Sequence, residues 1–529
     1  MRGVIEGFYG PPWVHATRLA AVEFLAQRGM NAYVYAPKSD PKHRERWRDG
    51  YDSDELERFR DLAEHAAGVG TRFGFAISPG LDIDYASADD RDTLLGKLAP
   101  LLDAGVDWVV LALDDIPNRP GLADAQADLT TWLLDTVRSR RPGSRVTLVP
   151  TEYVGTRPTA YLHALAAGLP DEVDVMWTGP TVCSPVIRAA DARAWASALA
   201  GRRPLLWDNY PVNDGSMEQS LHLGPYRGRE PELTDEVDGV LCNPMLQAHA
   251  SRIALSTAAD FLREPERYDP EASWSRAIAV VGGARREPLR AVATACADGP
   301  LLSADLLEAH ALVTAVVDAV DTPEWPGAVC DLRDHLTAVR QARHAWSDAP
   351  DDPLRAELDP WLECAATEAE AGLAALRLIQ QVQPVARADD RGAGKAALPD
   401  AELAMVHAFA VVFAWSTARR GKRVAFGPRF AVYPAVVQLA DGAPGLDVDL
   451  AVAEDKSAID RLCRYALGRY RAWSRARPAP LRVTAEDEHI EVGPDGSFDA
   501  AGPRELVVHA GTASTAVGGG VPFLDPRLA

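Results

Sequence analysis

Two adjacent carboxylates, Asp114 and Asp115, follow an apolar run and could supply acid and base chemistry. The run, residues 108–113, reads Trp-Val-Val-Leu-Ala-Leu and predicts a strand that is buried on both faces. In folds built from parallel strands, ligands sit outside the carboxyl ends of the strands, so this position favours an active site. The same dipeptide recurs in polar surroundings typical of a solvated surface, at Asp89–Asp90, Asp351–Asp352 and Asp389–Asp390.

The elements that must position this pair are strand-like runs alternating with helix-like segments, from residue 3 to about residue 265. Eight such units in this length predict an α/β fold, a (β/α)₈ TIM barrel. An open doubly wound sheet is the alternative, but the first strand is not followed by a Gly-x-Gly-x-x-Gly turn. The expected strands are 3–8, 32–36, 73–77, 108–113, 146–149, 173–177, 204–207 and 237–241, and the helices between them include 15–28, 53–67, 89–102 and 122–138.

The two ends of these strands differ in composition. Polar, aromatic, Gly and Pro residues follow every expected strand, whereas plain turns such as Arg28-Gly29 and Ala104-Gly105 precede them. Binding groups of a barrel enzyme sit on the loops at the carboxyl ends of its strands. The asymmetry therefore predicts one functional face.

The remainder of the chain is predicted to be mainly helical. We expect three domains: a catalytic (β/α)₈ barrel over 1–267, a mainly α-helical bundle over 268–478, and a small β-rich or loosely ordered segment over 479–529. Expected helices cover 273–281, 289–296, 304–319, 328–346, 353–382, 401–420 and 457–475, with a linker at 389–400 and short strands near 481–483 and 505–508.

Composition narrows the classes of function. The 529 residues include 76 acidic and 55 basic ones, and the net charge of −21 opposes binding to nucleic acid or to anionic membranes. The six cysteines show no metal-ligand spacing, so we expect buried thiols, no metal and no cofactor. The N-terminus lacks the apolar core of a signal peptide, and no run is long enough to span a membrane, so a cytoplasmic location is expected.

Ten motifs at these strand ends resemble glycoside hydrolase family 84, the retaining β-N-acetylglucosaminidases that include protein O-GlcNAc hydrolases. The resemblance covers residues 3 to about 265, and the motifs stand in the family's order at family-like spacing. They are Glu6–Gly10, Tyr35–Lys38, Ile77–Gly80, Asp114–Asp115, Pro150–Tyr153, Trp177–Pro180, Trp207–Asn209, Asn213–Asp214, Gly224–Arg229 and Asn243–Pro244.

The spacing of the two aspartates favours one kind of glycosidase chemistry. Two neighbours at one strand end cannot easily flank a sugar from opposite sides, so the 2-acetamido oxygen of the substrate is the expected nucleophile. By resemblance, Asp114 holds the acetamide, Asp115 is the general acid and then the general base, and Tyr153 meets the acetamide oxygen. We expect the close pairing to raise the pKa of one aspartate. Glu152 is the competitor if an ordinary two-carboxylate mechanism applies.

The resemblance also implies a set of substrate-binding residues. Trp207 would form a wall of the N-acetyl pocket, Lys38 and the backbone of Gly7 would face the 3-hydroxyl, and the remaining polar groups would hold hydroxyls and the acetamide: Asn209, Asp214 and Asn243. Glu6 and Asp208 are expected to support these residues, and His15 and His43 are expected to be surface or capping residues.

The expected function is that of a retaining exo-β-N-acetylglucosaminidase that removes terminal β-linked GlcNAc through an oxazoline intermediate. Two alternatives stay open: a hydrolase of another β-N-acetylhexosamine conjugate, and a non-catalytic GlcNAc-binding protein. The expected partner is a GlcNAc-bearing protein, oligosaccharide or small molecule. The resemblance also leaves a homodimer open, because some related enzymes use their helical region to dimerise.

Overall fold

The structure is a computed structural model. It describes residues 1–297, 308–320, 322–347, 351–390, 423–427, 430–438, 444–452, 457–475, 482–485, 488–490, 506–510 and 513–517. Two compact units can be distinguished, the first containing Met1–Arg286 and the second containing most of the helices that follow.

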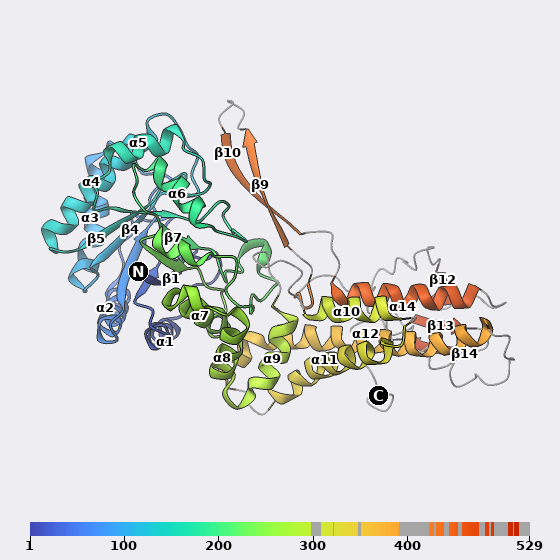
Figure 1. Cartoon of the computed structure of the whole chain (residues 1–529). Coiled ribbons are helices and arrows are strands. Elements are labelled where there is room, and N and C mark those ends of the chain that lie inside the picture. The colour runs from blue at the N-terminus through green and yellow to red at the C-terminus, as the bar shows by residue number, and fades with distance from the viewer. Residues whose placement is uncertain are drawn as a thin grey trace. The chain divides into compact units, whose positions relative to one another are not determined.

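Eight parallel strands form a closed barrel in sequence order, which confirms the predicted fold (Figure 1). The last strand pairs with the first through Arg2 and Val240, and this pairing closes the barrel. The first strand ends before the predicted residue 8, because the chain turns where the Gly7 N–H bonds to the Ile5 carbonyl at 2.8 Å. The strands are β1 (Arg2–Glu6), β2 (Ala32–Tyr35), β3 (Arg72–Ile77), β4 (Trp108–Ala112), β5 (Arg145–Val149), β6 (Asp174–Trp177), β7 (Leu205–Asp208) and β8 (Gly239–Cys242).

Helices alternate with these strands and surround the barrel (Figure 1). The start of the second helix is fixed by a capping box, in which Asp52 accepts from the Glu55 N–H and Glu55 accepts from the Asp52 N–H. The helices of the barrel are α1 (His15–Gln27), α2 (Ser53–Gly68), α3 (Ala88–Asp103), α4 (Leu122–Arg140), α5 (Ala160–Gly168), α6 (Ala189–Ala198) and α7 (Ala248–Arg263).

The barrel strands are apolar on both faces because each face has its own core. Along β4, Val110 belongs to the cluster inside the barrel, whereas Val109 and Leu111 pack in the layer between strands and helices. Trp207 of β7 belongs to the inner cluster, and Tyr153 packs against that cluster. The barrel is therefore filled by side chains, and chemistry is confined to its ends.

The predicted helices beyond the barrel are confirmed within the described residues. α12 continues past the predicted end at residue 382 and includes Asp389 and Asp390, so the predicted linker begins with helical residues. The rest of that linker, residues 304–307 and the predicted helix 401–420 lie outside the described residues. The helices are α8 (Pro270–Gly282), α9 (Arg286–Ala295), α10 (Glu308–Ala319), α11 (Trp325–Ala345), α12 (Pro353–Asp390) and α14 (Ala458–Arg475).

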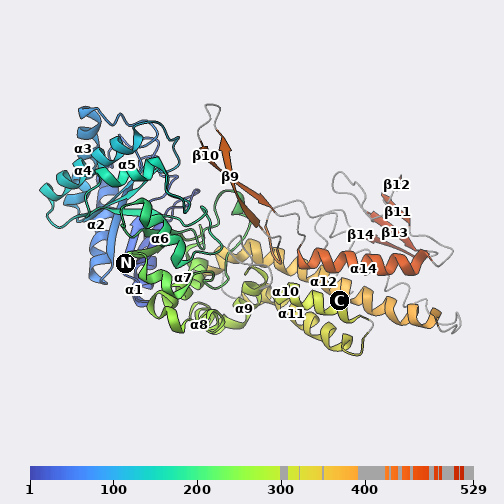
Figure 2. The same ribbon diagram turned by 45° about the horizontal axis from the view of Figure 1, so that its top comes forward.

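The second unit is built on long helices that lie side by side. α11 packs along α12, and α12 packs along α14, as both views show (Figures 1 and 2). Cys330 of α11 is exposed and Cys364 of α12 is half-buried, so the expectation of buried thiols is wrong at these two positions. Among the described residues, no helix is long and apolar enough to cross a membrane.

Two small antiparallel sheets complete the described structure. Strands β9 (Phe430–Gln438) and β10 (Pro444–Val452) pair with each other and were not predicted. A second sheet has the order β12-β11-β13-β14 and agrees with the short strands expected near the C-terminus. Its strands are β11 (Arg482–Ala485), β12 (Glu488–Ile490), β13 (Leu506–Ala510) and β14 (Ala513–Val517).

Candidate active site

The predicted site residues gather at the carboxyl ends of six barrel strands. They lie at the ends of β1, β2, β4, β5, β7 and β8 or in the loops that follow. Contacts connect them into two groups, one that contains Asp114 and one that contains Asp115. The residues brought together in this way are Gly7, Lys38, Asp114, Asp115, Tyr153, Trp207, Asn209, Asp214 and Asn243.

Asp114 is a buried carboxylate with one oxygen paired and one oxygen unpaired. Its side chain is 8% exposed, and Oδ2 forms an ion pair with the Lys38 ammonium, whose side chain is 3% exposed. Oδ1 is buried and has no hydrogen-bond partner in the described part of the chain. An unsatisfied buried acceptor is costly in a folded protein and marks a place where a donor from a ligand would fit.

Opposing effects act on the ionisation of Asp114. Burial alone would raise the pKa of this carboxyl, but the positive charges of Lys38 and Arg44 and the Lys38 hydrogen bond together lower it. The pKa of Asp114 is lowered because the neighbouring cations outweigh the burial, so Asp114 is not the member of the pair to which a raised pKa applies. Asp114 is held as an anion, the form that accepts an N–H bond and stabilises positive charge.

Asp115 has different surroundings, although it is the next residue. Its backbone has a φ of 53°, in the left-handed region that Asp adopts more readily than most residues. Its side chain is exposed, and both carboxylate oxygens accept a phenol: Oδ2 from Tyr9 at 2.8 Å and Oδ1 from Tyr153 at 2.8 Å. The change of backbone conformation after β4 thus gives the chain one buried and one accessible carboxylate side by side.

The two tyrosines are suited to act as hydrogen-bond donors. Burial, and then the negative charge of Asp115, raise the pKa of both Tyr9 and Tyr153 well above the usual value for tyrosine. The two hydroxyls therefore stay protonated. Tyr9 also donates its backbone N–H to Asp214 Oδ2 at 2.7 Å, so this residue links the end of β4 to the loop after β7.

Sequence reasoning did not assign Tyr9 and Arg44 to the site. Tyr9 lies inside the Glu6–Gly10 motif, so its position was a usable signal. Arg44 donates to the Asp115 carbonyl at 3.3 Å and to the Ser78 hydroxyl at 3.3 Å. Arg44 carried no sequence signal, because it approaches the aspartates only when the loop after β2 is folded.

The group that contains Asp114 and Lys38 also contains the Trp207 indole and the side-chain amides of Asn209 and Asn243. Trp207 Nε1 donates to Asn209 Oδ1 at 2.9 Å, and Asn243 Nδ2 donates to the same oxygen at 2.9 Å. The Gly7 N–H in turn donates to Asn243 Oδ1 at 3.2 Å. A Cβ at Gly7 would lie 2.3 Å from Trp207 Cζ2, so only glycine lets β1 end this close to the indole. These contacts fix the plane of Trp207, over which the Lys38 ammonium lies 5.7 Å from the ring centroid.

Asp214 is the remaining acid among the predicted substrate-binding residues. Burial is the main cause that raises its pKa above the usual aspartate value, while the hydrogen bond from the Tyr9 backbone acts in the opposite direction. Asp214 lies in the loop after β7 and accepts the Tyr9 N–H, and the resemblance assigns it a contact with sugar hydroxyls.

The three further carboxylates hold protein side chains. Glu6 accepts from Arg18 Nε at 2.8 Å and Nη2 at 2.9 Å, and Asp208 is paired with the buried Arg229. Glu152 accepts from Asn118 through Oε1 and from Thr159 through Oε2, so both of its oxygens are engaged. Glu152 is therefore a weaker candidate for proton transfer than Asp115.

The predictions for the two histidines have different outcomes. His15 begins α1 and contacts Asp61 Oδ2 at 2.7 Å. His43 is fully buried, so its assignment as a surface or capping residue is wrong. Burial, and then the charges of Lys38, Arg44 and Lys97, hold the pKa of His43 well below its usual value. Among the described residues, no cluster of three or more His, Cys, Asp or Glu side chains could hold a metal ion.

Comparisons with known proteins agree with this arrangement. The sequence profile described as beta-N-acetylglucosaminidase matches residues 2–294, more than half of the chain. Over 278 residues the chain is 35% identical to the Protein O-GlcNAcase of Rattus norvegicus and to that of Mus musculus, a match covering 49% of this chain. The matched part is 30% of the length of each of those relatives.

Solved structures extend the likeness beyond the barrel. A variant of the O-GlcNAc hydrolase from Thermobaculum terrenum is 30% identical with a TM-score of 0.67, and the match covers 80% of this chain and 99% of that one. The structure of CpGH84B is 29% identical with a TM-score of 0.69, covering 78% of this chain and 73% of that one.

The fold and the paired carboxylates define a barrel of the glycoside hydrolase class, with its site at the carboxyl ends of the strands. The chain belongs to the β-N-acetylglucosaminidase family, glycoside hydrolase family 84.

Proposed function

We propose that this chain is a retaining exo-β-N-acetylglucosaminidase that hydrolyses terminal β-linked GlcNAc by substrate-assisted catalysis. The observation that carries the proposal is the unequal environment of two adjacent carboxylates. Asp114 is buried, ionised and has a free oxygen, whereas Asp115 is accessible and held by two phenols. Family membership and the names of the relatives support the same reaction.

In the first step, the acetamide carbonyl oxygen of the substrate attacks the anomeric carbon. The bond from that carbon to the leaving oxygen breaks, and protonated Asp115 gives its proton to the leaving oxygen. Asp114 Oδ1 accepts the acetamide N–H, which orients the amide and stabilises the positive charge that develops on the oxazoline ring. The Lys38 ion pair keeps Asp114 from taking the proton itself.

In the second step, water attacks the anomeric carbon from the side that the leaving group vacated. Asp115, now a carboxylate, takes a proton from this water, and the bond to the acetamide oxygen breaks. The product is the β-anomer of GlcNAc, because two inversions at one carbon give net retention. One residue serves as acid and then as base, which fits the accessible position of Asp115.

The other group of residues supports recognition of the sugar. Trp207, held by Asn209, offers a flat apolar wall for the acetyl methyl group. Asp214 and the buried Lys38 are polar groups of the site that can bind hydroxyls. We propose a protein, oligosaccharide or small molecule carrying terminal GlcNAc as substrate, and the names of the mammalian and bacterial relatives favour an O-GlcNAc conjugate.

The test compares wild type, Asp114→Ala and Asp115→Ala on two aryl β-N-acetylglucosaminides, one with a leaving group of low pKa and one with a leaving group of high pKa. Loss of a general acid lowers rates by about 10² to 10⁴-fold and matters most when the leaving group needs a proton. We expect Asp115→Ala to keep most activity only on the good leaving group, and Asp114→Ala to lose activity on both.

Two outcomes would replace the proposal. Folded wild-type protein that binds N-acetylglucosamine but cleaves neither substrate would be a binding protein. Faster cleavage of an aryl β-N-acetylgalactosaminide than of the matching glucosaminide would indicate a hydrolase of a different N-acetylhexosamine conjugate.

A further inference from the structure

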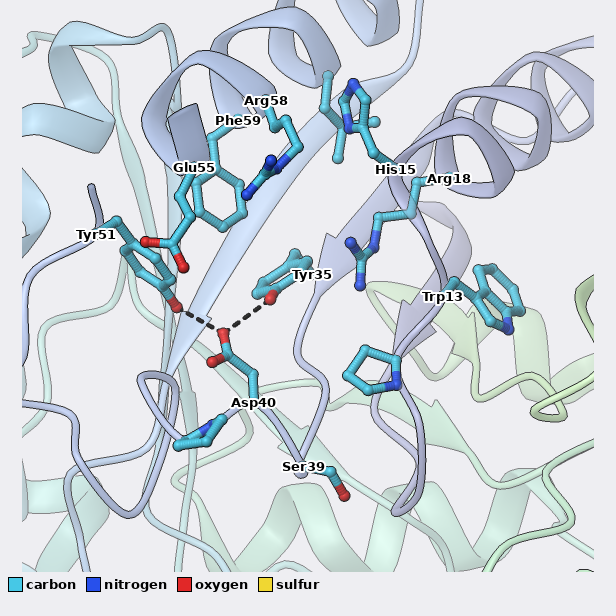
Figure 3. Close-up of a pocket in the computed structure, with 13 residues that line it drawn as sticks. Trp13, His15, Arg18, Tyr35, Ser39, Asp40, Tyr51, Glu55, Arg58 and Phe59 are labelled. Atoms are coloured by element: carbon cyan, nitrogen blue, oxygen red, sulfur yellow. Dashed lines mark hydrogen bonds between the residues drawn. The ribbon is translucent and has the colours of Figure 1, made fainter. Parts of the chain in front are cut away.

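A pocket lies outside the site described above, between the beginnings of α1 and α2 and the loop after β2 (Figure 3). Its volume is about 350 Å³, within the range of pockets that bind small molecules. None of the nine predicted site residues lines it. We call it the α1–α2 pocket, and its apolar walls are the rings of Trp13, Tyr35 and Phe59 with the prolines Pro12 and Pro41.

The acidic side chains of the α1–α2 pocket already have hydrogen-bond or ion-pair partners in the protein. Asp40 Oδ2 accepts from the hydroxyls of Tyr35 and Tyr51, each at 2.8 Å, as the dashed lines in Figure 3 show. Its other oxygen accepts the Lys42 backbone N–H at 2.9 Å. Glu55 Oε2 pairs with the Lys42 ammonium at 2.6 Å. Neither acid is therefore well placed to attract a cation from solution.

The basic side chains retain binding capacity. Arg58 of α2 is exposed, and its guanidinium forms no hydrogen bond or close ion pair with any residue that the structure describes. Arg18 of α1 uses Nε and Nη2 on Glu6, and its Nη1 has no hydrogen bond among those residues. Figure 3 shows these two guanidinium groups reaching toward the pocket from the two helices, with His15 beside them.

The basic residues of the pocket contrast with the net negative charge of the whole chain. The chain is acidic overall, with 76 acidic and 55 basic residues, yet three basic side chains line one pocket. Arg18 is paired with Glu6 and His15 with Asp61, so Arg58 is the one of the three with no hydrogen bond or close ion pair among the described residues. The Arg18 guanidinium also lies over the Tyr35 ring, 4.7 Å from its centroid, so this cation is fixed in place. The planar guanidinium group of arginine matches the geometry of carboxylate and phosphate oxygens.

We propose that the α1–α2 pocket binds a small organic anion, a carboxylate or a phosphate monoester that carries a ring or other apolar body. The anionic group lies between Arg18 and Arg58, and the apolar body packs on Trp13, Tyr35 and Phe59. This site is separate from the proposed reaction and does not depend on it. It lies close to the catalytic end, because Ser39 and Asp40 line the pocket while the preceding residue, Lys38, pairs with Asp114.

The test is a calorimetric titration of the full chain at low ionic strength with phenyl phosphate, benzoate and, as a neutral probe, benzyl alcohol. The test variant is Arg58→Glu. Its matched control is Arg60→Glu, the same change of charge at an exposed residue of α2 that does not line the pocket. Melting temperatures of both variants report whether they fold.

We expect the wild type and Arg60→Glu to bind at least one anion and Arg58→Glu to bind it about tenfold more weakly or worse, as loss of a charge-assisted hydrogen bond predicts. Binding of phenyl phosphate alone identifies a phosphate site, and binding of benzoate alone identifies a carboxylate site. The proposal is overturned if neither anion binds, if benzyl alcohol binds equally well, or if both variants weaken binding to the same extent.

Discussion

Replacement of Lys38 by methionine should shift the acid limb of the pH–rate profile to higher pH. Burial raises the pKa of Asp114, while Lys38 and then Arg44 lower it, and the net result in the wild type is a lowered pKa. Lys38→Met removes the largest of the favourable charges and leaves the burial. The pKa of Asp114 therefore rises in the variant, and the ionised form required for catalysis is lost at a higher pH.

The size of the shift follows from the burial of the pair. Removing one partner of a buried ion pair costs about 3–5 kcal/mol, because the other charge is left uncompensated. One pKa unit corresponds to about 1.4 kcal/mol, so the full cost would equal roughly two to four units. Because Arg44 remains, we expect the acid limb to move by about one to two pH units.

The linked effect on stability has a definite sign. The lowered pKa of Asp114 in the folded wild type contributes stability that is present above the unfolded pKa, about 4. This contribution is lost as the pH falls through the folded value. The variant lacks this contribution, so at neutral pH it should unfold at a lower urea concentration than the wild type.

The assay is kcat/KM for an aryl β-N-acetylglucosaminide measured as a function of pH. The position of the acid limb is the readout, since loss of a contact between Lys38 and the sugar would lower the whole profile without moving it. Lys42→Met is the control, because this ammonium pairs with Glu55 instead of Asp114. An acid limb at the wild-type pH in Lys38→Met would refute the reasoning.

Three further predictions concern other residues of the barrel. Tyr9→Phe removes one of two phenol donors to Asp115 and should lower kcat/KM about tenfold, whereas an unchanged kcat/KM would exclude Tyr9 from the site. Gly7→Ala places a Cβ 2.3 Å from Trp207 Cζ2 and should raise KM by displacing the indole; an unaltered KM would show that the indole position is not critical. Burial lowers the pKa of His222 to about 4, so this residue alone should lower the free energy of unfolding by about 3 kcal/mol as the pH drops from about 6.5 to about 4, because only the unfolded state takes up its proton. His222→Asn should reduce that fall, and an equal fall in the variant would contradict the assignment.

The sequence predicted the barrel well because its signals are local. Strands buried on both faces produce short apolar runs such as 108–112, and amphipathic segments between these runs mark the helices. The strands β9 and β10 were missed because the surrounding sequence reads as helix. The burial of His43 was missed because a polar loop residue gives no local sign of being covered by the folded chain.

The sequence predicted which residues would gather at one end of the barrel, apart from Tyr9 and Arg44, but it did not predict their electrostatics. Motifs at strand ends named the residues, and the closed barrel explains why such distant segments meet at one end. The lowered pKa of Asp114 depends on Lys38, which is 76 positions away in the sequence, and on Arg44. Such a charge balance follows from three-dimensional placement and burial, so it could not be obtained from the spacing of the two aspartates alone.

The most direct test of substrate-assisted catalysis changes the nucleophile that the substrate supplies. Aryl β-glucosaminides whose N-acetyl group carries one, two or three fluorine atoms have a progressively less nucleophilic carbonyl oxygen. If that oxygen attacks the anomeric carbon, kcat/KM should fall steeply with each added fluorine, with Asp114 and Asp115 intact. A kcat/KM that does not change across the series would contradict the account and would point to a nucleophile from the protein, with Glu152 as the first residue to replace.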